Sequence, residues 1–229
     1  MKFAIILSGC GNRDGSELQE TLSLMLAIDR RNASYQCFAP EGLFTVVPHV
    51  DSRDDEEEEG DQLQLADMEQ RDIFVESARL CRGDILPIEA YSPEEFDALL
   101  LPGGMGAARN LSTYAFDGHR MEVIDSVHDA ILSTYRDHKP VGAMCIAPML
   151  LAKTLGRYGI EITLGADDNH ASADARSLGC RTTACGPTEI CVDDEHKIVT
   201  TPAYMAASRI GQIFDGADSL VEAVSKMVR

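Results

Sequence analysis

One short stretch, residues 139–148, constrains the fold of this chain more than any other. Its sequence, KPVGAMCIAP, is typical of a buried strand that runs straight into a helix, with Cys145 at the corner. Pro148 falls in the first helical turn, where a missing N–H group costs little. The unpaired N–H groups of a helix N-terminus favour an anion, so we expect this thiol to be biased toward the nucleophilic thiolate. The alternative is a small buried apolar residue, as most free cysteines are.

Around this stretch, apolar strands alternate with amphipathic helices. Further strands are predicted at residues 2–7, 35–39, 84–88, 96–101 and 160–164, and a hairpin at 188–200. Further helices are predicted from Ser16, over 68–80, over 119–138, briefly within 165–177, and from about residue 203 to the end. Such alternation predicts an α/β fold with a mostly parallel sheet that helices cover on both faces. With no repeat and no linker, residues 1–229 are expected to form a single domain.

The predicted helix that starts at Ser16 has apolar residues at helical spacing. These are Leu18, Leu22, Met25, Leu26 and Ile28, which we expect to face the core.

Two glycines follow the predicted strand 96–101 directly. Without a Cβ atom, Gly103 and Gly104 allow backbone N–H groups to approach a ligand, and two such groups near a nucleophile form an oxyanion hole. Neighbouring parallel strands would bring this loop and Cys145 to the same sheet edge. A tight turn without chemistry is the alternative.

The glycine-rich loop after the first strand invites comparison with a dinucleotide site. Asp14 stands where the G-x-G-x-x-G motif has its third glycine, and no acidic residue closes the next strand, so we expect no nucleotide. Glu17 lies in the first turn of the following predicted helix. It could point over the carboxyl edge of the sheet, where open α/β sheets bind ligands, or it could simply cap the helix.

Charge excludes some partners. The net charge of −18 disfavours nucleic acid and anionic membranes, which both need a basic surface. Much of this charge lies in the run 54–59, within a loop at about 50–62 that we expect to be solvated or disordered. No apolar run is long enough to span a bilayer. The N-terminal residues do not resemble a signal peptide, which favours the cytoplasm, or a mitochondrion if a presequence has been removed.

The other potential ligands and bases have no distinctive spacing. The seven cysteines are expected to be reduced thiols, and Cys180, Cys185, Cys191 and His196 do not fit the spacing of a structural zinc site. A cysteine enzyme usually needs a base. His49 and His170 are in predicted loops and could reach the sheet edge, whereas His128, His138 and His196 are expected to be solvated.

Motifs along the whole chain resemble those of one protein family. They are LSGCG at 7–11, DGSE at 14–17, LPGGMGAA at 101–108, NLS at 110–112, MCIAP at 144–148 and VTTPAYM at 199–205. Together and in this order, they resemble the ElbB/ES1 branch of the DJ-1/PfpI superfamily. The resemblance implies a three-layer, flavodoxin-like sandwich related to class I glutamine amidotransferase domains.

The resemblance also implies roles for individual residues. It places a nucleophile-elbow cysteine at Cys145 and a supporting acid at Glu17. The residues expected to hold the oxyanion or the substrate are Gly103, Gly104, Asn110 and the backbone N–H group of Ile146.

The activity that the resemblance implies is that of a glyoxalase. Bacterial ElbB proteins are described as converting glyoxal-type dicarbonyls to 2-hydroxy acids without a cofactor. We therefore expect a small carbonyl substrate, no metal, no cofactor and a homodimer.

Two departures from related proteins narrow the choice of activity. Protease-like members have histidine after the cysteine, where this chain has Ile146, and glutaminases have a His–Glu pair where it reads TTPA at 200–203. Peptide hydrolysis and glutaminase activity are therefore disfavoured. The alternatives to a glyoxalase are a redox-sensing or partner-binding protein, with Cys145 oxidised to a sulfinate, or a glutaminase-like subunit that needs a synthase partner.

Overall fold

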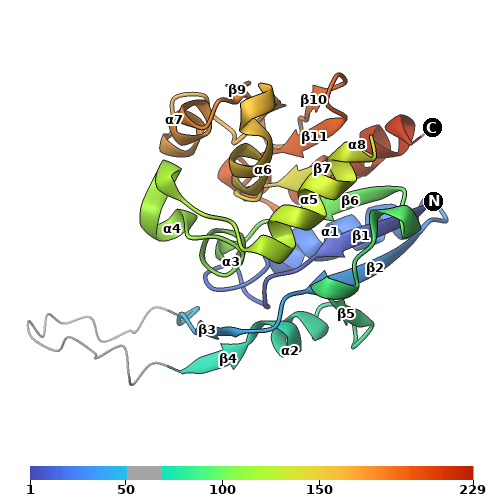
Figure 1. Ribbon diagram of the computed structural model, residues 1–229, viewed down its shortest axis with the longest axis vertical. Helices are drawn as coiled ribbons and strands as arrows, with labels where there is room; N and C mark the ends of the chain where they lie inside the picture. The colour runs from blue at the N-terminus through green and yellow to red at the C-terminus, as the bar shows by residue number, and fades with distance from the viewer. Residues whose placement is uncertain (51–68, 229) are drawn as a thin grey trace, which may run out of the picture.

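The computed structural model describes residues 1–50 and 69–228 (Figure 1). A seven-stranded sheet has the order β10-β11-β7-β6-β1-β2-β5, and only β10 runs antiparallel to its neighbour. Its strands are β1 (Lys2–Ile6), β2 (Ser34–Ala39), β5 (Ile85–Pro87), β6 (Ala98–Leu101), β7 (Val141–Met144), β10 (Cys191–Asp193) and β11 (Ile198–Thr201). The predicted mostly parallel sheet and the predicted hairpin are confirmed.

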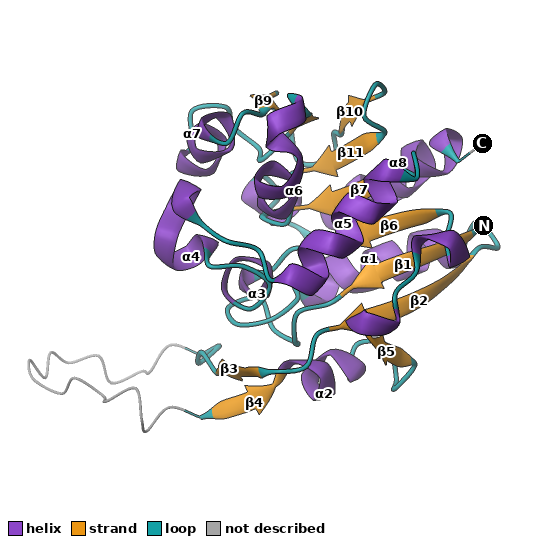
Figure 2. Ribbon diagram, in the orientation of Figure 1, coloured by secondary structure: helices purple, strands orange, loops and turns teal. Residues whose placement is uncertain are grey.

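Helices cover both faces of the sheet, as the secondary-structure colours show (Figure 2). One face is packed by α3 (Met105–Arg109), α5 (Asp125–Arg136), α6 (Pro148–Leu155) and α7 (His170–Ser177). The other is packed by α1 (Leu18–Asp29), α2 (Ile73–Ala78) and α8 (Ile210–Met227). The central strands β6 and β7 are wholly buried, as expected of a parallel sheet between two helical layers.

Shorter elements complete the described fold. The helix α4 is Tyr114–Asp117, and short 3-10 helices lie at Ile88–Ala90, Pro93–Glu95, Gly118–Arg120, Gly156–Tyr158 and Ala203–Met205. Two small sheets pair β3 (Leu43–Thr45) with β4 (Gln70–Asp72), and β8 (Glu161–Ile162) with β9 (Arg181–Thr182). None of the described helices is long and apolar enough to cross a membrane.

The helix predicted over 68–80 is shorter than expected. Residues 70–72 instead pair with β3, and the Asp72 carboxylate accepts a hydrogen bond from the Val75 N–H group at 2.9 Å, which starts α2 at residue 73. The acidic run 54–59 and most of the predicted loop around it lie outside the described residues.

The first helix also differs from its prediction. It begins at Leu18 rather than Ser16, because the buried Ser16 hydroxyl instead accepts a hydrogen bond from the Ser8 N–H group at 2.9 Å. Its buried face includes Met25 and Ile28 as expected. Three of the five predicted core positions, Leu18, Leu22 and Leu26, are exposed by 40%, 50% and 42%.

The helix predicted over 119–138 and the strand predicted over 160–164 are shorter too. The helix α5 spans residues 125–136, after a 3-10 turn at 118–120. The strand β8 has only two residues and pairs with β9 outside the main sheet, because β10 occupies the edge next to β11.

Candidate active site

Cys145 lies at a sharp turn between the end of β7 and the start of α6. Its φ angle is +57°, in the left-handed region that side chains other than glycine rarely adopt. The Cys145 N–H group donates to the Thr201 carbonyl at 3.0 Å, and the Ala147 N–H group donates to the Met144 carbonyl at 2.9 Å. These bonds hold a backbone conformation that costs of the order of 1–3 kcal/mol on its own. The turn raises the thiol above the carboxyl edge of the sheet.

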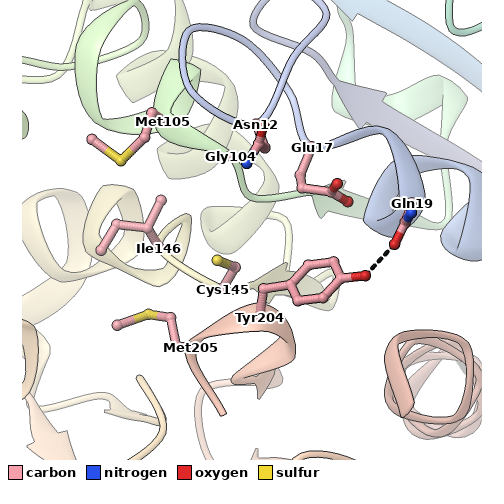
Figure 3. A pocket seen from close by; sticks show the side chains of 9 residues that line it. All are labelled: Asn12, Glu17, Gln19, Gly104, Met105, Cys145, Ile146, Tyr204 and Met205. Atoms are coloured by element: carbon pink, nitrogen blue, oxygen red, sulfur yellow. Dashed lines mark hydrogen bonds between the residues drawn. The ribbon is translucent and has the colours of Figure 1, made fainter. Parts of the chain in front are cut away.

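A cavity of about 570 Å³ opens over this thiol (Figure 3). Its lining comes from the loop after β1, the start of α1, the turn after β6, the elbow after β7 and the 3-10 turn after β11. The lining residues are Asn12, Glu17, Gln19, Gly104, Met105, Cys145, Ile146, Tyr204 and Met205. Four parallel strands thus contribute to one site, as an open α/β sheet requires.

Two backbone N–H groups point at the Cys145 sulfur. Those of Gly104 and Ile146 both donate hydrogen bonds to it and thereby lower its pKa. Two backbone N–H donors beside a sulfur nucleophile are the kind of groups from which oxyanion holes are built.

A buried acid that sequence reasoning missed, Glu20, contacts the same sulfur. Its side chain is fully buried in α1 and shares a hydrogen bond with the Cys145 thiol. One carboxyl oxygen accepts from the Gly103 N–H group at 2.9 Å, and the other from the Tyr204 N–H group at 3.5 Å. Its position in the sequence could have indicated its burial, because Glu20, Leu24 and Ala27 recur at helical spacing on the buried face of α1.

The electrostatics of this pair contradict the expectation of a thiolate. Burial raises the pKa of the Cys145 thiol, and the Glu20 carboxylate raises it further, which outweighs the two N–H donors. Burial and the neighbouring Glu17 carboxylate raise the pKa of Glu20 to about 8. Helix α6 begins only at Pro148, three residues after the thiol, so desolvation dominates over the helix N-terminus. At rest, both groups hold protons at neutral pH.

Glu17 fits both of the alternatives left open for it. Its carboxylate caps α1 by accepting from the Glu20 N–H group at 2.6 Å, and the same side chain lines the cavity. Burial raises its pKa, while the N–H groups of Glu20 and Gln19 lower it. The cap fixes the carboxyl group at the cavity wall.

Gly103 allows Glu20 and Cys145 to pack closely, a role that the sequence did not indicate. Its N–H group is already engaged by Glu20, so it does not face the cavity as an oxyanion donor. A Cβ atom on Gly103 would lie 2.4 Å from the Cys145 Cβ atom. Glycine is therefore required here for close packing between the acid and the thiol.

Asn110 does not line the cavity, contrary to expectation. Its side-chain amide donates to the Ser8 carbonyl at 2.8 Å and to the Asp14 carbonyl at 2.7 Å. Both N–H bonds of the amide are thus used to hold the loop between β1 and α1 against α3. Asn110 positions the loop that carries Asn12.

The candidate histidine bases do not reach the thiol. His49 accepts a hydrogen bond from the Arg13 N–H group at 3.4 Å, and His170 lies 3.3 Å from the Asp174 carboxylate. Neither residue lines the cavity. His196 forms a hydrogen bond with the Asp193 carboxylate at 2.9 Å.

Within residues 1–50 and 69–228, no cluster of histidine, cysteine, aspartate or glutamate side chains could hold a metal ion.

Comparisons with known proteins place the chain among related sequences. No family model matches it. It is 35% identical to the rat ES1 protein homolog, mitochondrial, over an alignment of 234 positions that covers 99% of this chain and 84% of that protein. A crystal structure of an isoprenoid biosynthesis protein with an amidotransferase-like domain, from Ehrlichia chaffeensis, superposes with a TM-score of 0.86 at 30% identity and covers 100% of both chains.

A more distant structure shares the fold alone. Glyoxalase III from Candida albicans superposes with a TM-score of 0.57 at 15% identity, over 97% of both chains.

Proposed function

The chain belongs to the ElbB/ES1 branch of the DJ-1/PfpI superfamily, and from this premise we propose that it is a glyoxalase-type enzyme that converts small dicarbonyls to 2-hydroxy acids. The proposal rests chiefly on one observation. The Cys145 thiol lines the cavity together with Gly104 and Ile146, whose N–H groups act on the sulfur, and the buried Glu20 shares a hydrogen bond with the thiol. This is the arrangement that addition of a thiol to an aldehyde needs.

The first step forms a carbon–sulfur bond. In the form of the Cys145–Glu20 pair that has lost one proton, the sulfur attacks the aldehyde carbon while Glu20 holds the remaining proton. The carbonyl oxygen becomes an oxyanion, which the N–H groups of Gly104 and Ile146 stabilise.

The second step moves a proton within the bound substrate. Glu17, at the cavity wall, takes the proton from the sulfur-bearing carbon and returns it to the adjacent carbonyl carbon. One carbon is oxidised and its neighbour reduced, so no external electron acceptor is needed. The transfer leaves an alkoxide on the reduced carbon, which takes the proton that Glu20 had held, and the product is a thioester of a 2-hydroxy acid. Water then hydrolyses the thioester to the free acid, and its two hydrogens restore the singly protonated Cys145–Glu20 pair and complete the acid.

The test is product formation by purified protein. Wild type is expected to produce lactate from methylglyoxal and glycolate from glyoxal, and Cys145→Ala is expected to produce neither. Cys185→Ala is the matched control, because this thiol lies in the loop before β10 and outside the cavity. Equal turnover by Cys145→Ala and wild type would overturn the mechanism.

The same site supports a second candidate, a redox sensor. The N–H groups of Gly104 and Ile146 and the protonated Glu20 could equally hold the oxygens of a sulfinate on Cys145. Intact-mass measurement after mild peroxide separates the two functions. Addition of two oxygens at Cys145 in a protein without carbonyl turnover would favour the sensor.

The cellular compartment is part of the proposal. The rat relative is named as a mitochondrial protein, and we extend that compartment to this chain. Fractionation of cells that express the tagged protein would test the assignment.

A further inference from the structure

The cavity above Cys145 is divided into an apolar side and a polar side. The side chains of Met105, Ile146 and Met205 lie on one side of the thiol (Figure 3). Glu17 and Gln19 lie on the other, and Gln19 accepts a hydrogen bond from the Tyr204 hydroxyl. A ligand bound at the sulfur would therefore meet two chemically different walls.

The lining of the cavity offers no cation to an anionic substituent of a ligand. None of the nine lining residues is lysine, arginine or histidine. Glu17 is the one acid among them. An anionic group on the substrate would lose its hydration here and gain no partner of opposite charge.

The apolar side has room for more than the smallest dicarbonyls. The volume of about 570 Å³ is in the range of pockets that hold drug-sized ligands, roughly 300–1,000 Å³. Two of its three apolar side chains are methionines, whose flexible thioethers adapt to substituents of different shape. With the carbonyl at the sulfur and the donors of Gly104 and Ile146, the substituent of the substrate would lie against Met105 and Met205.

We propose, on the basis of the proposed function, that this site selects 2-oxoaldehydes with an uncharged apolar substituent and rejects those that carry a carboxylate. The reaction is the one balanced above, in which a dicarbonyl and water give a 2-hydroxy acid. The substrate class is that of alkyl- and arylglyoxals.

Three substrates test the inference with wild-type protein. Methylglyoxal, phenylglyoxal and 4-carboxyphenylglyoxal differ in apolar area and in charge, and their 2-hydroxy acid products can be measured by chromatography. We expect kcat/KM for phenylglyoxal to exceed that for methylglyoxal by about tenfold, through burial of the ring. The carboxylated ring should lower kcat/KM by on the order of a hundredfold relative to phenylglyoxal, through an unpaired buried charge. Cys145→Ala, run in parallel, corrects for reaction outside the site.

A charge substitution on the apolar side gives a second test. Met105 is 37% exposed at the start of α3, so a lysine there should be accommodated at the cavity wall. Met105→Lys should raise kcat/KM for 4-carboxyphenylglyoxal by about tenfold and lower it for phenylglyoxal, because the ammonium group supplies the missing counter-charge. Leu43→Lys is the matched control: Leu43 is 66% exposed in β3 and does not line the cavity, so a lysine there should keep the wild-type order of substrates.

The outcomes separate this inference from the function on which it rests. Similar kcat/KM values for the neutral and the carboxylated ring in wild type would overturn the inference and leave the glyoxalase proposal standing. No product that depends on Cys145 from any of the three substrates would overturn the proposed function itself. The wild-type comparison needs no variant, so the test does not depend on the folding of Met105→Lys.

Discussion

Cys145 and Glu20 form a single proton-holding unit, and this unit sets the chemistry of the site. The thiol and the carboxyl group share a hydrogen bond, and both are raised in pKa by burial. An acid whose pKa is about 8 can both accept and return a proton near neutral pH, as general acid–base catalysis requires. The raised pKa of Glu20 also makes the free energy of unfolding depend on pH.

Stability should fall as the pH rises, and Glu20→Gln should remove this fall. The pKa of Glu20 is raised from 4.5 to about 8 in the folded protein. Between these values the folded state keeps a proton that the unfolded state has lost, so the free energy of unfolding decreases by up to about 1.4 kcal/mol per pH unit. Its contribution is fully present below pH 4.5 and is lost by about pH 8.

Thermal unfolding of wild type and Glu20→Gln at pH 5 to 9 measures this effect. The melting temperature of the variant, relative to wild type, should increase from pH 5 to about pH 8 and then level off. The variant should also lose turnover, because it has no carboxyl group to hold the proton of the thiol. A constant difference in melting temperature over this range would contradict the raised pKa.

At the scale of elements, the turn between β6 and α3 carries Gly104, the proposed oxyanion donor. Gly104 has a φ angle of +95°, and a Cβ atom on it would lie 2.3 Å from the Gly15 carbonyl oxygen. The turn and the loop after β1 are thus packed so closely that a side chain would displace the Gly104 N–H group from the sulfur.

Gly104→Ala should therefore lower kcat by about a hundredfold or more, as loss of an oxyanion donor does in other enzymes. Gly83→Ala is the matched control: its φ angle is +84°, but no atom lies within 4 Å of the added Cβ position. Both substitutions introduce backbone strain, and only the first disturbs the site. Steady-state kinetics of the two variants would show whether strain alone explains the loss.

The helix α1 has two apolar stripes rather than one. Leu24, Met25 and Ile28 pack in the core, while Leu18 and Leu22 face outward together with Leu26. The buried face of the helix is instead completed by polar residues, among them Glu20 and Thr21. Hydrophobic spacing alone did not separate the two stripes, because both repeat at helical intervals.

At the scale of the whole molecule, the exposed leucines of α1 bear on the homodimer, which stays a prediction. Leu18, Leu22 and Leu26 are spaced by four residues and form one stripe along the helix. If the chain forms a dimer through this stripe, Leu22→Glu should shift it to monomer, since a carboxylate would be buried without a partner.

Light scattering after size-exclusion chromatography measures the mass of each form. Leu43→Glu is the control, because Leu43 is 66% exposed in β3, away from α1. A Leu22→Glu protein that remains dimeric would show that another surface forms the interface, and a monomeric wild type would contradict the homodimer itself.

Sequence reasoning succeeded where the signal is local. Alternating apolar strands and helices predicted the parallel sheet, and the KPVGAMCIAP stretch predicted the elbow at Cys145 before a helix that starts at Pro148. Glycines after a buried strand likewise predicted a turn beside the thiol. Each of these signals depends on residues within about ten positions of one another, so the chain carries them whatever it packs against.

The tertiary structure decided everything that depends on contacts between distant segments. In the folded chain, Glu20 rather than Glu17 is the partner of the Cys145 thiol. The Gly103 N–H group donates to Glu20, and the Asn110 amide donates to the loop after β1. The tertiary structure also reversed the expected pKa shift of Cys145. Desolvation and hydrogen bonding arise only when segments far apart in sequence meet at the sheet edge, and no local pattern records which polar groups will be buried together there.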